Sequence, residues 1–226
     1  QGFTEIQTPK LVGTATEGGA NVFAVESFGR PAYLAQSPQL YKQVMVGVFE
    51  RVFETGPVFR AEPHDTTRHI NQYTSLDAEI GFIDDHRDVM RVLTGAVRHI
   101  LDTLDRDYAD ELRLLKAQVP AVGETIPSIR FRDAQQVIYE VYGEDCRQEQ
   151  DLSPQHERWL CEWAQAEHGS ALLFVTHYPA DKRPFYTMPA AGDPAHTHSF
   201  DLLFRGTEIV TGGQRADIVH SILAYD

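Results

Sequence analysis

The chain has 226 residues, a formal net charge of −13 at pH 7, 42% hydrophobic residues and 23% charged residues. This composition excludes a globally disordered chain, and the excess of acidic residues excludes a protein that only coats nucleic acid, so we expect no DNA partner. No apolar run approaches the ~20 residues that a membrane helix needs, and we find no signal-peptide pattern. We therefore expect a cytoplasmic protein without a membrane partner.

Helix and strand patterns alternate along the first half of the chain. Residues 22–35 predict two short strands around a turn. The Ser-Pro pair at 37–38 predicts the start of a helix, whose apolar stripe continues to the Gly-Pro pair at 56–57. Strands are predicted at 58–62 and at 73–83, and apolar and polar residues alternate strictly in the second of these.

The second half of the chain predicts helices first and strands last. Helices are predicted at about 86–118, 133–142 and 154–168. Strands are predicted at 171–178, 199–205 and 208–211, with a Pro- and Gly-rich loop at 179–197. Hairpin-like strand pairs among helices predict an α+β fold, with an antiparallel sheet flanked by helices.

The predicted strands carry ionised side chains on one face and apolar side chains on the other. Residues two apart in a strand share a face, so Arg60 points the same way as Glu62, and Asp77 the same way as Glu79. In the last strand pair, Asp201 faces away from its apolar neighbours. These strands therefore predict sheet surfaces on which positive and negative groups lie together.

Two interpretations of these charged faces stay open. A sheet with a solvated outer face is the ordinary one. The alternative is a single floor, ringed by cations, that suits a polyanion together with a divalent cation. That floor would carry Arg60, Glu62, Asp77, Asp201 and Glu208, with Lys42, Arg68 and Arg215 around it.

Three short motifs carry weaker signals. The pair His196 and His198 has no third ligand at a spacing that suits a metal ion. The Glu-Gly-Gly-Ala run at 17–20 lacks the lysine of a phosphate-binding loop. Gly212 and Gly213 precede Arg215, which would let the backbone approach a ligand closely.

Ordered motifs across residues 3–215 carry a resemblance to a known family. Phe59-Arg60-Ala61-Glu62, followed by Arg68-His69, Tyr73 and Leu76-Asp77-Ala78-Glu79, resembles the second signature motif of class II aminoacyl-tRNA synthetases. Further motifs are similar to aspartyl-tRNA synthetases of the archaeal-like type, and they are Thr8-Pro9-Lys10, Glu17-Gly18-Gly19-Ala20, Gln36-Ser37-Pro38-Gln39-Leu40-Tyr41-Lys42, Arg183-Pro184-Phe185-Tyr186, Ser199-Phe200-Asp201-Leu202-Leu203-Phe204-Arg205-Gly206 and Glu208-Ile209-Val210-Thr211-Gly212-Gly213-Gln214-Arg215.

The resemblance implies a fold, a reaction and a set of partners. The fold is an antiparallel sheet flanked by helices, in a homodimer formed through the first motif. The reaction joins L-aspartate and ATP into aspartyl-adenylate with release of pyrophosphate, and aspartate then passes to the 3′ end of tRNA. The tRNA is that for aspartate, with the tRNA for asparagine as a further acceptor left open.

The resemblance also implies roles at the nucleotide. Arg60 would be the catalytic residue and contact both the α-phosphate and the reacting carboxylate, two oxyanions that suit a guanidinium. Glu62 would accept from the adenine amino group and Tyr73 would stack on the adenine. The remaining implied ligands serve the outer phosphates and Mg²⁺, an ion that prefers hard oxygen ligands. They are Arg68 and His69 for the phosphates, and Glu208 and Thr211 for Mg²⁺.

At the amino acid, the resemblance implies a pocket of mixed charge. Lys42 and Arg215 would meet the side-chain carboxylate of aspartate. Asparagine is neutral there, and its binding would leave two buried cations without a counter-charge. The full implied set for aspartate is Glu17, Gln39, Lys42, Arg60, Asp77, Thr211 and Arg215, in which Glu17 and Asp77 hold the ammonium group.

The sequence also departs from the family pattern. Gln72 stands where the family often has glutamate, and His198 stands where other residues are usual. Residues 216–226 contain neither glycine nor arginine, so they do not match the third signature motif. The anticodon-binding domain that precedes the catalytic domain in the family has no counterpart. We therefore expect residues 1–226 to be a partial catalytic domain, with weak or no ATP activation.

Two rival functions remain open. The first is an asparaginyl-tRNA synthetase, or a paralogue that forms asparagine, although the motifs at 183–186 and 200–204 favour the aspartyl side. The second is a binding protein related to the synthetases that lacks the third motif and catalyses nothing.

Overall fold

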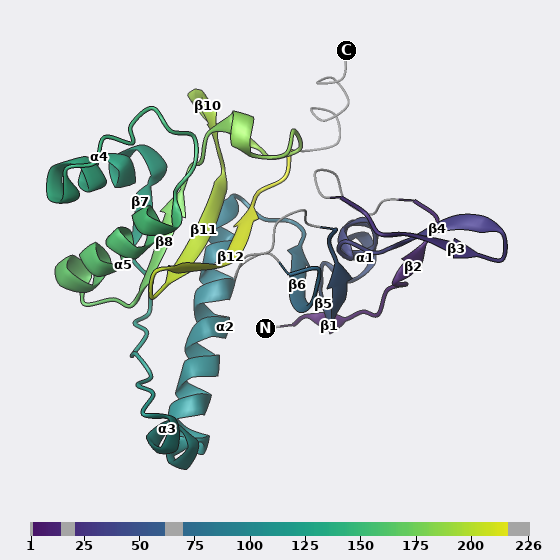
Figure 1. The fold of residues 1–226 in the computed structure, drawn as a ribbon, viewed down its shortest axis with the longest axis horizontal. Coiled ribbons are helices and arrows are strands. Elements are labelled where there is room, and N and C mark those ends of the chain that lie inside the picture. The colour runs from purple at the N-terminus through teal and green to yellow at the C-terminus, as the bar shows by residue number, and fades with distance from the viewer. Residues whose placement is uncertain (1, 15–20, 62–69, 217–226) are drawn as a thin grey trace. The chain divides into compact units, whose positions relative to one another are not determined.

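The computed structural model describes residues 2–14, 21–61 and 70–216 (Figure 1). The chain divides into two compact units, Gln1–Ile83 and Asp84–Asp226. Helices accompany strands that pair mostly antiparallel, which confirms the predicted α+β class.

The described part of unit 1 contains two small sheets and one helix, whose bounds are given below. The strand orders are β1-β5-β6 in one sheet and β2-β4-β3 in the other. Strands β1 and β5 are parallel, and the other neighbouring strands are antiparallel. The elements are β1 (Thr4–Glu5), β2 (Leu11–Val12), β3 (Ala24–Ser27), β4 (Arg30–Leu34), α1 (Gln39–Phe49), β5 (Arg51–Phe59) and β6 (Gln72–Ile80). The two strands predicted at 22–35 are confirmed as β3 and β4.

Helix α1 ends seven residues before the predicted Gly-Pro stop, so that prediction is wrong. Glu50 caps the helix with a left-handed backbone, φ 63°, and its carbonyl accepts from Gly81 N at 2.8 Å. The chain then enters β5, which pairs with β6 from Arg51 onward. Pro57 is tolerated there because β1 pairs only with Val52 and Phe53, so β5 has an unpaired edge beside the proline.

The start of α1 is also shifted by one residue. Pro38 occupies the N-cap position and the first helical residue is Gln39. The Ser37 hydroxyl still accepts from the Gln39 backbone N at 3.2 Å, so the serine supports the helix start as predicted.

Polar residues, not apolar ones, make the buried side of α1. Leu40, Val44 and Val48 are 56–68% exposed, whereas Gln39 and Lys42 are buried. Strand β6 shows the same inversion, because Ser75, Asp77 and Glu79 are half-buried whereas Leu76 is 65% exposed. Side chains that face each other from α1 and β6 are therefore held by charge and hydrogen bonds.

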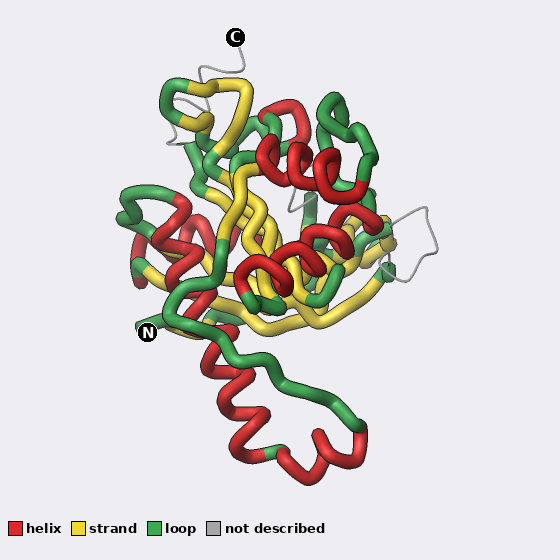
Figure 2. Tube along the Cα trace, turned by 90° about the vertical axis from the view of Figure 1, so that its left-hand side faces the viewer, coloured by secondary structure: helices red, strands yellow, loops and turns green. Residues whose placement is uncertain are grey.

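Unit 2 is built around a four-stranded sheet with the order β12-β11-β8-β7 (Figure 1). Figure 2 distinguishes the helices from the strands by colour. Only the β7–β8 pair is parallel. The helices are α2 (His86–Asp107), α3 (Ala109–Leu115), α4 (Phe131–Tyr142), α5 (Pro154–His168) and the 3-10 turn η1 (Ala180–Lys182). The strands are β7 (Ser128–Arg130), β8 (Leu172–Thr176), β9 (Pro189–Ala190), β10 (Asp193–Thr197), β11 (Ser199–Phe204) and β12 (Thr207–Gly213).

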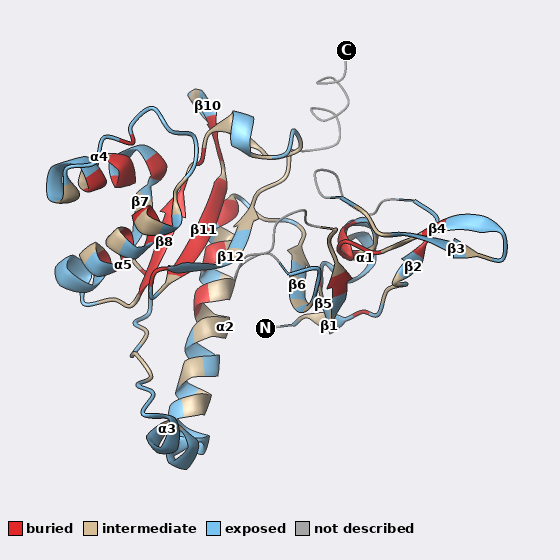
Figure 3. Cartoon of the chain, in the orientation of Figure 1, coloured by how far each residue is buried: buried red, intermediate tan, exposed pale blue. Residues whose placement is uncertain are grey.

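Two apolar clusters bury both faces of this sheet (Figure 3). Leu173, Val175 and Leu203 pack with α4 and α5 on one face. Phe200 and Leu202 pack with α2 on the other. Strands β8 and β11 are buried along almost their whole length, so the solvated outer face considered for each strand is wrong for these two.

Most predicted elements of unit 2 are confirmed. The helix predicted at 154–168 matches α5, which Ser153 caps. The long helical segment is interrupted at Tyr108, between α2 and α3. The segment predicted as a loop at 179–197 is partly wrong, because it contains η1 and the short pair β9–β10. Within the described ranges, no helix combines the length and apolar character needed to cross a membrane.

Candidate functional site

In unit 1, a buried lysine lies between two carboxylates. Lys42 Nζ is 3.0 Å from Asp77 Oδ1 and 3.7 Å from Glu79 Oε2, and its side chain is 6% exposed. Gln39 Nε2 donates to Glu79 Oε2 at 3.2 Å, and Ser75 Oγ donates to Asp77 Oδ2 at 2.6 Å. The structure thus brings together three predicted site residues, Gln39, Lys42 and Asp77.

The local sequence explains this cluster. Gln39 and Lys42 are three residues apart on α1 and therefore share one side of the helix. Asp77 and Glu79 are two apart on β6 and share one face of the strand. One cation faces two anions, so the cluster keeps one excess negative charge that can hold a cationic group.

Arg60 follows the end of β5, close to Tyr73 on β6. The Arg60 backbone N donates to Asn71 O at 3.0 Å, and its guanidinium carbon lies 5.9 Å from the centre of the Tyr73 ring. Strand pairing thus places these two predicted nucleotide ligands at the same end of the β5–β6 pair.

Glu54 is a buried charge that the sequence patterns did not single out. It is 1% exposed on β5, and its carboxylate accepts from Thr8 N at 2.9 Å and Thr8 Oγ1 at 2.7 Å. Lys10 Nζ lies 3.0 Å away. The Thr-Pro-Lys run at 8–10, noted as a family motif, therefore holds the buried carboxylate of β5.

In unit 2, Asp201 and Thr211 are directly paired across β11 and β12. Arg183 joins them, with Nη2 2.8 Å from Asp201 Oδ2 and Nη1 donating to Thr211 Oγ1 at 3.0 Å. Its guanidinium carbon also lies 4.1 Å from the centre of the Tyr178 ring. Burial and the neighbouring Asp201 carboxylate raise the pKa of Tyr178 well above its ordinary value, so this phenol stays protonated.

Asp201 is 5% exposed, and its Oδ1 has no hydrogen-bond partner among the described residues. A buried carboxylate oxygen without a close donor is costly, and Asp201 therefore depends on Arg183 for compensation of its charge. The sequence placed Asp201 on the charged floor but gave it no role at the site. The signal was present in the pattern, since Asp201 is the one ionised residue within the apolar strand at 199–204.

The end of β12 positions Arg215. The Arg215 guanidinium carbon lies 4.2 Å from the centre of the Tyr186 ring, and Thr187 forms a bridge with Arg215. A β-carbon on Gly212 would lie 2.6 Å from the Phe200 ring, and one on Gly213 would lie 2.9 Å from His198 O. Both glycines are therefore required because a side chain would collide with β11 or with His198, which precedes it. The sequence had suggested a different reason, a close approach of the backbone to a ligand.

We expect Gly212→Ala to destabilise unit 2 and to displace the strand end that precedes Arg215. The added methyl group overlaps the Phe200 ring in a packed core, and overpacking of this kind costs ~1–3 kcal/mol. The shift of the urea midpoint measures this cost. A control is Gly123→Ala, where the nearest atom to the added carbon is Thr125 O at 3.6 Å, an ordinary van der Waals contact. An unchanged midpoint in Gly212→Ala would contradict the contact.

The remaining predicted site residues are distributed over both units and the undescribed segments. Glu208 lies near the start of β12, where its backbone N donates to Glu157 Oε2 at 3.0 Å. Glu17, Glu62, Arg68 and His69 lie outside the described residues. The charged residues do not form one sheet, because the strands fall into separate sheets in unit 1 and unit 2.

The comparisons with known proteins identify the family. A family model for class II tRNA synthetases (D, K and N) matches residues 1–222. The chain belongs to the class II tRNA synthetases. The family resemblance in the motifs is thereby confirmed, and so is the fold class that it implies.

Two curated relatives of this synthetase chain are aspartate–tRNA(Asp/Asn) ligases. The protein of Deinococcus radiodurans is 49% identical over 234 residues, which cover 100% of this chain and 54% of the relative. That of Thermus thermophilus is 50% identical over 215 residues, which cover 95% of this chain and 50% of the relative. The chain spans about half the length of the curated relatives it matches.

A solved structure of the family has the same fold. Asparaginyl-tRNA synthetase from Pyrococcus horikoshii, complexed with asparaginyl-adenylate, matches the synthetase chain with a TM-score of 0.86 and 29% identity. The match covers 99% of this chain and 51% of that chain. The shared fold therefore occurs with more than one amino-acid substrate, and specificity has to be argued from individual side chains.

A cavity of about 410 Å³ in unit 2 lies apart from the synthetase site residues. It is lined by parts of α4 and β10 and by the segment after α4, including Arg132, Arg147 and His196. None of the predicted site residues lines it. We therefore assign it no role in the binding of amino acid or nucleotide.

Proposed function

We propose that this chain is the catalytic-domain portion of an aspartate–tRNA ligase, which activates L-aspartate with ATP and passes it to tRNA. The arrangement of Lys42 between Asp77 and Glu79 is the observation that carries the proposal. The 49–50% identity to aspartate–tRNA(Asp/Asn) ligases supports the choice of substrate.

The buried ion pair suits an amino acid with an acidic side chain. Aspartate can insert between Lys42 and Asp77, because its side-chain carboxylate can take the lysine and its ammonium group the aspartate. One internal pair is then replaced by two pairs with the substrate, and no charge is left buried alone. Asparagine offers the same ammonium group, but its side chain has no carboxylate to pair with Lys42. Its binding is therefore weaker.

Activation requires a carboxylate to attack a phosphate that is already negative, so positioning and charge stabilisation dominate. In the proposed mechanism, Arg60 contacts the α-phosphate and the attacking carboxylate, and Tyr73 stacks on the adenine. Glu62, Arg68 and His69 complete the nucleotide site. Gln39, Lys42 and Glu17 are the proposed aspartate ligands of unit 1. Arg215 and Thr211 are the proposed aspartate ligands of unit 2.

Mg²⁺ is proposed as the ion that accompanies ATP. Across residues 2–14, 21–61 and 70–216, no three His, Cys, Asp or Glu side chains are grouped to hold a metal. The oxygens of Glu208, Thr211 and the partnerless Asp201 Oδ1 nevertheless fit a hard cation in type, and phosphate oxygens would complete its shell. When bound, the ion would neutralise phosphate charge.

The proposed acceptors are the tRNA for aspartate and, as in the names of the two relatives, the tRNA for asparagine. The proposed assembly is a homodimer. Charging assays with each purified tRNA and the mass of the protein in solution test these two points.

Pyrophosphate exchange with a panel of amino acids tests the proposed substrate. We expect exchange, or binding by calorimetry in the presence of ATP and Mg²⁺, with aspartate and not with asparagine. We further expect Arg215→Leu to remove the response to aspartate, whereas the exposed Arg113→Leu retains it. A response to asparagine alone would replace the proposal with an asparaginyl enzyme. Because residues 1–226 are expected to be a partial catalytic domain, binding of aspartate without exchange is consistent with the proposal, whereas binding of neither aspartate nor asparagine would contradict it.

A further inference from the structure

Three histidines from separate segments of unit 2 meet beside the end of β12. The ring centre of His86, at the start of α2, lies 5.1 Å from that of His177 and 5.0 Å from that of His198. The rings of His177 and His198 are 5.8 Å apart. His86 is 3% exposed, and its Nδ1 has no hydrogen-bond partner among the described residues.

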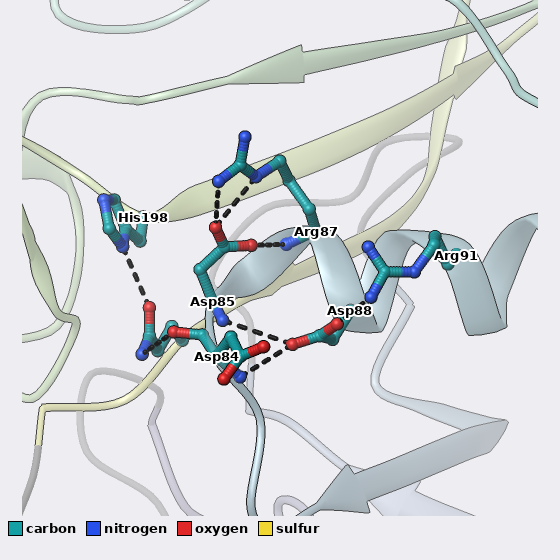
Figure 4. A network of polar contacts seen from close by, with 7 residues as sticks. Asp84, Asp85, Arg87, Asp88, Arg91 and His198 are labelled. Carbon is teal, nitrogen blue, oxygen red and sulfur yellow. Dashed lines mark hydrogen bonds and ion pairs between the residues drawn. The ribbon is translucent and has the colours of Figure 1, made fainter.

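The cluster is tied to the segment that carries Arg215. His198 Nδ1 donates to Gln214 Oε1 at 2.9 Å, and Gln214 Nε2 donates to Asp84 O at 3.4 Å (Figure 4). The backbone is tied as well, because Gln214 N donates to His198 O at 2.8 Å and Met188 N donates to Gln214 O at 2.9 Å. Gln214 thus connects the histidine cluster, the start of α2 and Arg215.

The capping of α2 holds His86 in this position. Asp85 accepts from Arg87 N, and Asp88 accepts from Asp85 N, which forms a capping box around the first turn (Figure 4). His86 is therefore the first residue of a long helix, where the helix dipole disfavours a positive charge. A second proton on this buried ring would also face two further imidazoles within about 5 Å.

We propose that His86, His177 and His198 form an acid-sensitive latch that positions residues 213–215. At neutral pH the uncharged rings of His86 and His177 pack with His198, which holds Gln214. In acid, His86 and His177 each take one proton from solvent, their like charges repel, and the latch opens. His86, His177 and His198 are thus positioning residues for the segment of Arg215. Every readout below is structural, so the latch is tested independently of the proposed ligase activity.

Some neighbouring charged groups raise the pKa of His86 and His177, and others lower it. Asp85 and Arg87 lie beside His86 on α2. Arg130 from β7, together with His196 and Asp193 from β10, acts on His177. Burial is the largest cause that lowers the pKa of His86, to about 4, and the other two histidines lower it further. Burial and then Arg130 lower the pKa of His177, also to about 4.

The sign of the pH dependence follows from these shifts. A histidine whose pKa is lowered in the folded state binds its proton more readily when unfolded. The stability that it contributes is complete above pH 6.5 and is lost as the pH falls towards 4. For His86 alone, the unfolding equilibrium constant at pH 5 is expected to exceed its neutral value about 30-fold.

Urea unfolding of the full chain at pH 7.5 and pH 5, combined with hydrogen exchange, tests the latch. We expect acid to raise the unfolding constant and to reduce the intrinsic-rate-corrected protection of residues 210–216 at least tenfold. His86→Phe keeps a ring without a titratable group and should reduce this acid response to the share that His177 contributes. The matched control is His168→Asn, at an exposed histidine of α5, which should keep the full response.

His198→Asn tests the contact with Gln214, because an amide can still donate to Gln214 Oε1. We expect protection of residues 210–216 at pH 7.5 to persist in this variant, and its loss at pH 5 to persist as well because His86 and His177 are unchanged. The imidazole titrations of the wild-type chain, followed by NMR, need no variant at all. Ordinary titration of His86 and His177 near pH 6.5 would overturn the proposal. So would stoichiometric zinc binding by the cluster, or an unaltered acid response in a folded His86→Phe.

Discussion

Lys42→Ala is expected to abolish aspartate-dependent pyrophosphate exchange and to destabilise unit 1. The substitution removes the cation that lies 3.0 Å from Asp77 and 3.7 Å from Glu79, so two partly buried carboxylates face each other without a counter-charge. Removal of one partner from a buried ion pair costs ~3–5 kcal/mol, and we expect the lower end because both carboxylates retain some exposure. Exchange assays and urea unfolding measure the two effects.

Two matched variants separate binding from folding in this experiment. Lys42→Arg keeps the positive charge and should retain the stability of unit 1, although the larger guanidinium should weaken the response to aspartate. Lys182→Ala removes a lysine from the surface pair with Asp151 and should leave both measurements unchanged. If a folded Lys42→Ala protein exchanges pyrophosphate with aspartate at the wild-type rate, Lys42 does not bind the substrate.

Arg183→Leu is expected to produce the largest loss of stability in unit 2. The guanidinium ties Asp201 to Thr211 and packs on Tyr178, and Asp201 is almost fully buried. Without it the Asp201 carboxylate has neither a cation nor a donor for Oδ1, which leaves an uncompensated buried charge. The expected cost is ~3–5 kcal/mol, measured as a change in the free energy of unfolding at pH 7.

A double-mutant cycle tests whether the charge pair causes this loss. In Arg183→Leu/Asp201→Leu the stranded carboxylate is gone, so the double variant should be more stable than Arg183→Leu alone. A similar cycle with Arg147 and Asp145, an exposed pair, should give a coupling near zero. Equal stability of the single and double variants at positions 183 and 201 would assign the loss to packing on Tyr178.

The two clusters share one arrangement. Lys42 on α1 and Arg183 before β9 are each held by carboxylates from a strand. The strands supply rigid positions for these carboxylates. Each cluster therefore depends on an ion pair, and removal of either partner leaves a buried charge.

The proposed latch makes the position of residues 213–215, at the end of β12, depend on pH. Its three imidazoles do not belong to the implied substrate contacts, yet Gln214 connects them to the residue before Arg215. Arg215 is therefore expected to be held in position at neutral pH and released in acid.

Local patterns were reliable where capping and periodicity act within one segment. Residues 154–168 form α5 as predicted, since Ser153 caps the helix and Pro154 opens it. The alternation on β6 likewise placed Asp77 and Glu79 on one face. The motif order along residues 3–215 was sufficient to identify the family, which the comparisons confirmed.

Contacts between distant segments decided the rest. The apolar stripe of α1 predicted a longer helix, but pairing of β5 with β6 from Arg51 onward competes for the same backbone groups and ends the helix at Phe49. The buried side of α1 is polar because carboxylates of β6 face it, and nothing within the helix sequence encodes that partner.

By itself, the sequence determined the family and the α+β class, because these depend on the order of the motifs and on local patterns of apolar and polar residues. Only the tertiary structure decided that Lys42 is held by two carboxylates, that Gly212 accommodates the Phe200 ring and that His86, His177 and His198 meet. These contacts join segments far apart in the chain, and their energies depend on distance and burial, which no local pattern specifies.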